Sequence, residues 1–258
     1  MSFKMQSWLC ALAAVVTLSV SQFSTAGFTP FVIREAGGSA PTINPLTGGG
    51  TEFIITAGGQ KAALGSSDIN GTKLGDIGRL SIERLDDVSR FTAGSGPAVG
   101  PYLNFWVTDG SNFAVVANEP SNPAFQPLFN NGYDLTFADL ADKVAKVYEN
   151  SDKSWLPNNG VGLTFADLAH LTIMAPNNVP DWAGLGTGAP IVLSGRATNE
   201  SFGVNWVFGD TLSNYVSGDP GYQVRNAMVN STVPEPTTLV IACCGLMVAG
   251  LRRGRRRR

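Results

Sequence analysis

The chain has 258 residues, of which 43% are hydrophobic and 15% charged, and its 30 glycines and 15 prolines give a turn-rich composition. A chain of this length can bury a self-sufficient core, and the composition excludes long charged helices and coiled coils. The net charge is −2, but residues 27–236 contain eleven basic side chains and all twenty acidic ones. Because phosphate binding needs a clustered basic face, this segment argues against nucleic acid as a partner.

The first 26 residues have the three parts of a secretory signal peptide. Lys4 lies near the start, an apolar run covers residues 8–20, and Ser24, Thr25 and Ala26 are small. This pattern predicts passage through the Sec translocation machinery and cleavage after Ala26. An uncleaved anchor is the alternative, but a membrane span needs roughly 20 apolar residues, and this run is shorter.

Short runs of alternating apolar and polar residues then predict strands at 31–33, 53–56 and 79–85. Residues 68–71, with the sequence DING, and Asp76 offer oxygen ligands that could hold calcium. Their spacing departs from the EF-hand loop, and turn formation explains the same residues, so we predict neither a metal site nor a cofactor.

The densest acidic group of the body follows the third strand and comprises Glu83, Asp86 and Asp87. A pair of carboxylates is what a glycan-active hydrolase needs, although sequence distance does not give the carboxyl separation. A solvated turn is the alternative, and we favour it. We predict no catalytic residue and no enzymatic activity.

Residues 102–117 predict a hairpin. Leu103, Phe105 and Val107 alternate with polar or aromatic residues, a turn follows at 109–112, and residues 113–117 form the returning strand. If the apolar positions point inward, three side chains point outward on one face: Tyr102, Asn104 and Trp106. Aromatic rings beside an amide suit the binding of a sugar, so this face is a candidate glycan-binding site. Burial of these aromatics under another element is the alternative, and we favour it.

The seven residues LTFADLA occur twice, at 135–141 and at 163–169. In each copy a threonine can cap a helix while the aspartate three residues later reaches back, which predicts two short helices. The apolar stripe of the first copy continues to Tyr148, whereas Pro176 ends the second. Asp139 and Asp167 could form a paired ligand site; two similarly capped helices are the alternative that we favour.

Further strands are predicted at 191–194, 201–208 and 222–229. Together with the glycine-rich turns, they predict a mainly β domain over residues 27–232, an antiparallel, jelly-roll-like β-sandwich with two short accessory helices. His170 is the one histidine of the chain, and no nucleophile or nucleotide-binding motif accompanies it. The body contains no cysteine, so it must be held by its core alone.

The C-terminal residues 233–258 carry three features in order. Val233, Pro234, Glu235 and Pro236 form an extended, accessible motif, and an uncharged stretch follows at 237–251. As a helix this stretch would be about 22 Å long, which is marginal for a transmembrane span. The chain ends on a basic tail of six arginines: Arg252, Arg253, Arg255, Arg256, Arg257 and Arg258. The tail favours the cytoplasmic side and so places the body outside.

This order of motif, short span and arginines resembles the PEP-CTERM sorting signal of bacteria with an outer envelope. The resemblance covers this tail alone. It implies that an exosortase, an integral-membrane cysteine enzyme, recognises the motif, and that the inner membrane holds the precursor only transiently. An ordinary C-terminal anchor is the alternative, and it predicts the same orientation without processing.

These observations predict an exported protein of the cell surface or extracellular matrix, with a structural or adhesive role in the envelope or biofilm matrix. A lectin-like module that binds exopolysaccharide is the second hypothesis, and a glycan-active enzyme is a distant third.

Overall fold

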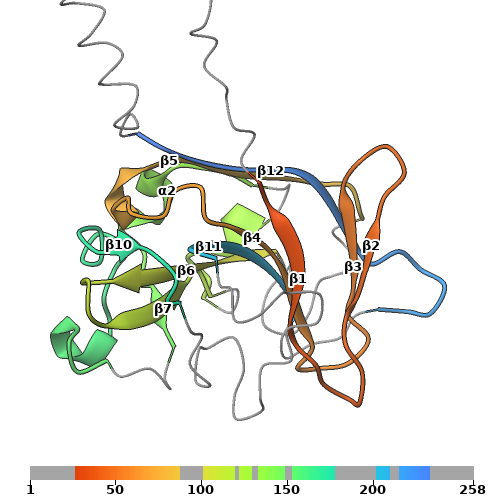
Figure 1. The fold of residues 1–258 in the computed structure, drawn as a ribbon, viewed down its shortest axis with the longest axis horizontal. Coiled ribbons are helices and arrows are strands. Elements are labelled where there is room, and N and C mark those ends of the chain that lie inside the picture. The colour runs from red at the N-terminus through yellow and green to blue at the C-terminus, as the bar shows by residue number, and fades with distance from the viewer. Residues whose placement is uncertain are drawn as a thin grey trace, which may run out of the picture.

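The computed structural model describes residues 27–87, 101–119, 122–129, 133–148, 153–177, 202–209 and 215–232. These residues are mainly β, as predicted: twelve strands form two sheets in which every strand pair is antiparallel. In Figure 1 the long strands β5 and β12 lie along one side of the molecule, and β6, β7 and β11 lie beneath them. The described chain is therefore built as two layers of antiparallel sheet.

The first sheet has seven strands in the order β1-β4-β11-β6-β7-β9, with β10 also paired to β6. Their bounds are β1 Thr29–Arg34, β4 Lys61–Ser66, β6 Tyr102–Thr108, β7 Phe113–Ala117, β9 Lys146–Val147, β10 Thr172–Ile173 and β11 Val204–Gly209. The hairpin of β6 and β7 confirms the prediction over 102–117. Its turn forms because Asp109 accepts hydrogen bonds from the backbone N–H groups of Ser111 (2.9 Å) and Asn112 (2.8 Å).

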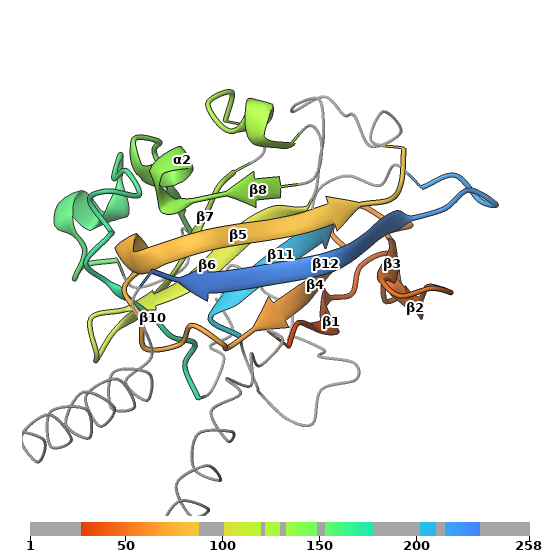
Figure 2. The ribbon, with the colours of Figure 1, turned by 90° about the horizontal axis from the view of Figure 1, so that it is seen from above.

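The second sheet has five strands in the order β2-β3-β12-β5-β8. Their bounds are β2 Thr42–Pro45, β3 Thr51–Ile54, β5 Ile77–Arg84, β8 Tyr133–Leu135 and β12 Tyr222–Ser231. Strands β5 and β12 form the centre of this sheet, and Figure 2 shows them side by side in front of the first sheet. The predicted strands at 53–56, 79–85 and 222–229 all fall here, and their ends differ from the observed ones by at most two residues.

An aromatic core joins the two sheets. Phe208 of β11 stacks on Phe53 of β3 with 4.1 Å between ring centroids, and Tyr222 of β12 packs against Phe208 at 5.7 Å. Further along, Phe105 of β6 meets Phe165 edge to face at 6.1 Å. Because these rings belong to strands of both sheets, they fix which side of each strand faces inward.

The outer edges of the two sheets are short or contain proline. β1 and β2 carry Pro30 and Pro45, and β8 and β9 have three and two residues. Proline removes a backbone donor, and a very short strand gives a further strand little to pair with. Each of these four edge strands thus bears a feature that blocks strand addition.

The repeated motif forms capped turns rather than two full helices. The first copy begins helix α2, Phe137–Ala141, with the capping box of Thr136 and Asp139. The prediction of a longer helix is wrong beyond Ala141, because Val144 instead pairs with Thr164 of the second copy and Val147 enters β9. The second copy forms turns, without a helix.

Three short 3₁₀ segments complete the described elements: η2 Leu74–Asp76, η4 Gln126–Phe129 and η5 Pro157–Gly160. No helix within the described residues is long and apolar enough to span a membrane. Several predictions lie outside these residues: the signal peptide 1–26, the strand at 191–194, the motif 233–236, the span 237–251 and the basic tail 252–258.

Candidate functional site

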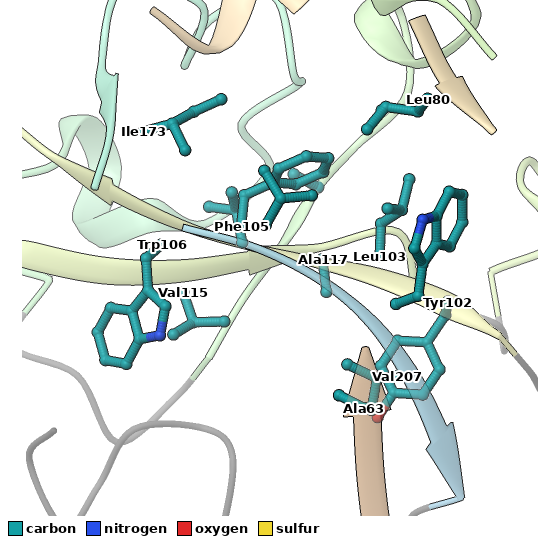
Figure 3. Packing of buried hydrophobic residues seen from close by; sticks show 14 of the residues in the cluster. Ala63, Leu80, Tyr102, Leu103, Phe105, Trp106, Val115, Ala117, Ile173 and Val207 are labelled. Atoms are coloured by element: carbon teal, nitrogen blue, oxygen red, sulfur yellow. The ribbon is translucent and has the colours of Figure 1, made fainter. Parts of the chain in front are cut away.

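The predicted glycan-binding residues share one face of β6, but this face is buried. Tyr102, Asn104 and Trp106 are 3%, 0% and 1% exposed, so the expectation that they point into solvent is wrong. Figure 3 shows Tyr102 and Trp106 on the side of the sheet opposite Phe105 and Leu80. The alternation in the sequence therefore separated the two faces of β6 correctly, but all seven residues of this strand are buried.

At the centre of this face, two asparagines lie opposite each other on neighbouring strands. Asn104 of β6 pairs in register with Asn205 of β11. The Asn205 amide donates to the backbone oxygen of Phe202 at 2.9 Å. Within the part of the chain that the structure describes, neither polar atom of the Asn104 side chain has a hydrogen-bond partner. A buried amide without partners destabilises a fold by about 1–3 kcal/mol, so the Asn104 side chain is a polar defect in this buried face.

A buried lysine lies on the same side of the sheet. Lys61, at the start of β4, is 1% exposed, and its ammonium lies 5.9 Å from the ring centroid of Tyr102 and 5.5 Å from that of Tyr148. The ammonium of Lys146 lies 5.4 Å from the ring centroid of Tyr148 and forms an ion pair with Glu119 at 2.6 Å. These are cation–π distances. Sequence reasoning missed Lys61 because β4 is buried throughout and lacks alternation.

The outer face of the five-stranded sheet is different, because charged and amide side chains from all five strands meet on it. We call this set the polar band. It consists of Asn44 (β2), Glu52 (β3), Gln223 and Arg225 (β12), Glu83 and Arg79 (β5) and Asp134 (β8). Its members alternate with buried inward residues such as Phe53, Val224 and Leu80, which places them together on the outside.

Two ion pairs with double contacts form one half of the polar band. Arg225 donates from Nε and Nη2 to Glu83 at 2.8 and 2.6 Å, and Arg79 donates in the same way to Asp134 at 2.6 and 2.9 Å. The side chains are 44% and 43% exposed in the first pair and 49% and 67% exposed in the second. Hydrogen bonds from these arginines lower the pKa values of Glu83 and Asp134, so both carboxylates are charged at neutral pH.

Glu52 organises the other half of the polar band. Burial on its own would raise the pKa of Glu52, but hydrogen bonds from the Asn44 amide (3.0 Å), the Gly221 backbone N–H (3.0 Å) and the Gln223 amide (3.1 Å) lower it overall. This one carboxylate therefore joins strands β2, β3 and β12.

A β-bulge interrupts strand β12 beside the first ion pair. The register shifts between Arg225 and Met228, and Asn226 takes a positive φ of 52°. Its amide donates to Glu83 at 2.9 Å. A non-glycine residue in this conformation is uncommon, and here it brings a third donor to the Glu83 carboxylate.

The other acidic candidates have structural partners. Asp86 accepts from Arg84 and from the backbone N–H of Gln223, with both charged side chains at most 1% exposed. Asp139 and Asp167 each accept from the N–H and the hydroxyl of their capping threonine. The capping interpretation is therefore supported, and the predicted solvated turn at Asp86 is wrong because its carboxylate is buried.

Two oxygens of the segment considered for calcium accept hydrogen bonds from its neighbours. Asp68 accepts from the hydroxyl of Ser66 at 2.7 Å, and the backbone oxygen of Asp76 accepts from the N–H of Thr232 at 2.8 Å. Among the described residues, no group of three or more histidine, cysteine, aspartate or glutamate side chains could hold a metal ion. His170 is exposed on a turn of the second LTFADLA copy.

Comparison with known proteins found no family model, no curated protein and no solved structure that matches this chain.

Proposed function

We propose that this protein is exported across the inner membrane, sorted by an exosortase and delivered to the cell surface or extracellular matrix, where its role is structural or adhesive. The observation that carries the proposal is the order of motif, apolar stretch and arginines in the sequence of residues 233–258, on a chain whose first 26 residues have the pattern of a signal peptide. A short span and a terminal arginine cluster orient the precursor with its body outside.

The character of the body supports this role. It contains no cysteine between residues 27 and 236, and the described part has a continuous aromatic core between two sheets. Such a domain, which we propose to be a jelly-roll-like sandwich, can fold after export without disulfide formation. The acidic candidates are engaged in caps and ion pairs, which favours a structural role over catalysis.

The test follows the protein in a bacterium that makes an exosortase. Pro234, Glu235 and Pro236 are replaced together by alanine, and membrane and released fractions are probed with an antibody to the body. We expect the full-length variant to accumulate in the membrane, whereas the wild type is shortened and released. Replacing the neighbouring Thr237 and Thr238 by alanine is the matched control and leaves processing intact. Equal release of all three proteins would contradict the proposal.

A further inference from the structure

We propose that the polar band on the outer face of the five-stranded sheet binds a neutral polysaccharide chain. This inference rests on the proposed function in one respect: a protein delivered to the envelope or matrix meets such polymers. It concerns a different face from the one that the sequence indicated, because the aromatic face of β6 is buried.

The chemistry of the band suits sugar hydroxyl groups. Every member ends in a planar amide, carboxylate or guanidinium group, and a hydroxyl can both donate to and accept from such groups. A guanidinium has five N–H groups, and within the described residues Arg225 and Arg79 each donate two of them to a carboxylate. The remaining donors point away from their own ion pair, so each arginine keeps hydrogen-bonding capacity for a ligand.

The band is also held in place before a ligand arrives. The two paired contacts fix both guanidinium planes, and Glu52 is fixed by three donors from Asn44, Gln223 and Gly221. Ordering long polar side chains opposes binding by about 0.5–1.5 kcal/mol for each side chain. Because neighbours already order these side chains, a ligand meets a smaller entropic cost than on an ordinary polar surface.

Charge selects a neutral polymer over an anionic one. Each arginine of the band is matched by one carboxylate, which leaves Glu52 as the uncompensated charge, and the segment 27–236 has nine more acidic than basic residues. An anionic polysaccharide would be repelled by this surface. A protein partner is disfavoured as well, because a stable protein interface has an apolar centre. At the middle of this face Met228 pairs with Ser81, between the two ion pairs, and it is half-buried, so it offers little apolar area.

The dimensions of the face favour a chain over a single sugar. The band crosses all five strands, from Asn44 on β2 to Asp134 on β8, and four strand spacings amount to roughly 19 Å. Figure 2 shows β5 and β12 turned toward the viewer with no other described element in front of them. A polymer can therefore lie along the face and contact several groups at once.

The test measures co-sedimentation of the full-length chain, solubilised in detergent, with amorphous cellulose, mannan and cross-linked dextran beads. Carboxymethyl dextran beads are the anionic counterpart of the dextran beads. We expect saturable binding to at least one neutral polymer and none to the carboxymethyl beads. In the double variant Glu83→Ala and Arg225→Ala, which removes both partners of one ion pair, we expect the affinity to fall about fivefold or more.

A matched control removes another exposed ion pair, that of Asp142 and Lys143, through Asp142→Ala with Lys143→Ala. This variant should bind like the wild type, and melting temperatures verify that both double variants are folded. If the Glu83 and Arg225 variant is unfolded, Asn44→Ala on the edge strand tests the same band. Binding to none of the neutral polymers, a preference for the carboxymethyl beads, or undiminished binding by the band variants overturns the inference. The binding assay uses the solubilised chain and does not depend on sorting, whereas the cell fractions test the proposed function. The two proposals can therefore fail independently.

Discussion

The outer faces of the two sheets have opposite character although both come from strands with alternating patterns. On β6 the outward positions hold Tyr102, Asn104 and Trp106, and all are buried. On β5 they hold Arg79, Ser81 and Glu83, which are exposed or half-buried. Alternation tells which residues share a face, but the charge of the outward positions tells whether the face meets water. A strand that is buried on both sides avoids charge at nearly every position.

Truncating an outward residue of β6 tests whether this face is buried, and it has the largest expected effect on stability. Trp106→Ala and, on the inner side, Phe105→Ala should each destabilise the protein by about 3–5 kcal/mol, because both large rings are almost fully buried. Chemical unfolding followed by circular dichroism measures both. A loss below about 1 kcal/mol for Trp106→Ala would mean that this face is open in solution.

Two asparagines near the same face differ in their hydrogen bonds, so their replacement should have different effects on stability. Asn118→Leu should cost about 1–3 kcal/mol, because Asn118 Oδ1 accepts from the buried N–H of Leu103 at 2.6 Å and that donor would be left without a partner. Asn104→Leu should be neutral or stabilising, because its amide has no hydrogen-bond partner within the described residues. Thermal melting of both variants provides the check, and a marked loss for Asn104→Leu would show that its amide is satisfied in solution.

The smallest effect is expected on the polar band. The pKa of Glu83 is lower in the folded protein than in the unfolded chain, mainly through its hydrogen bond from Arg225. Its contribution to stability is therefore fully present above the pKa of a free glutamate, about 4.3, and is lost as pH falls below it. Glu83→Gln should lower the melting temperature slightly at neutral pH and flatten its decline on acidification by a corresponding amount. An unchanged acid slope in Glu83→Gln would exclude this contribution.

Local patterns predicted much of the fold. The hairpin over 102–117, with its aspartate turn, and the strands β3, β5 and β12 follow from alternation and turn residues. The helix expected to continue to Tyr148 is absent because Val144 and Val147, which fit a helical stripe, are β-branched and pair elsewhere. Val144 forms a single bridge with Thr164, and Val147 pairs with Val116 of β7. Tertiary pairing decided this segment, and its sequence fitted both outcomes.

The polar band was not predictable in the same way. Glu83 and Arg225 are far apart in the chain and meet only because β5 pairs with β12. The sequence signal for the band was the alternation of the charged Arg79 and Glu83 with Leu80 and Ile82. This pattern indicates one exposed face of β5 but not which strands lie beside it. The burial of Tyr102 and Trp106 was expected as the alternative to an exposed face, but the sequence of a single strand does not show which element covers it.

The proline-containing or short edge strands of the two sheets limit how copies of this chain could associate. Among the described residues, the end strands of the two sheets are β1 and β2, which contain proline, and β8 and β9, which offer only three and two residues for backbone pairing between copies. Crowded copies are thus protected from growing into amyloid-like fibres.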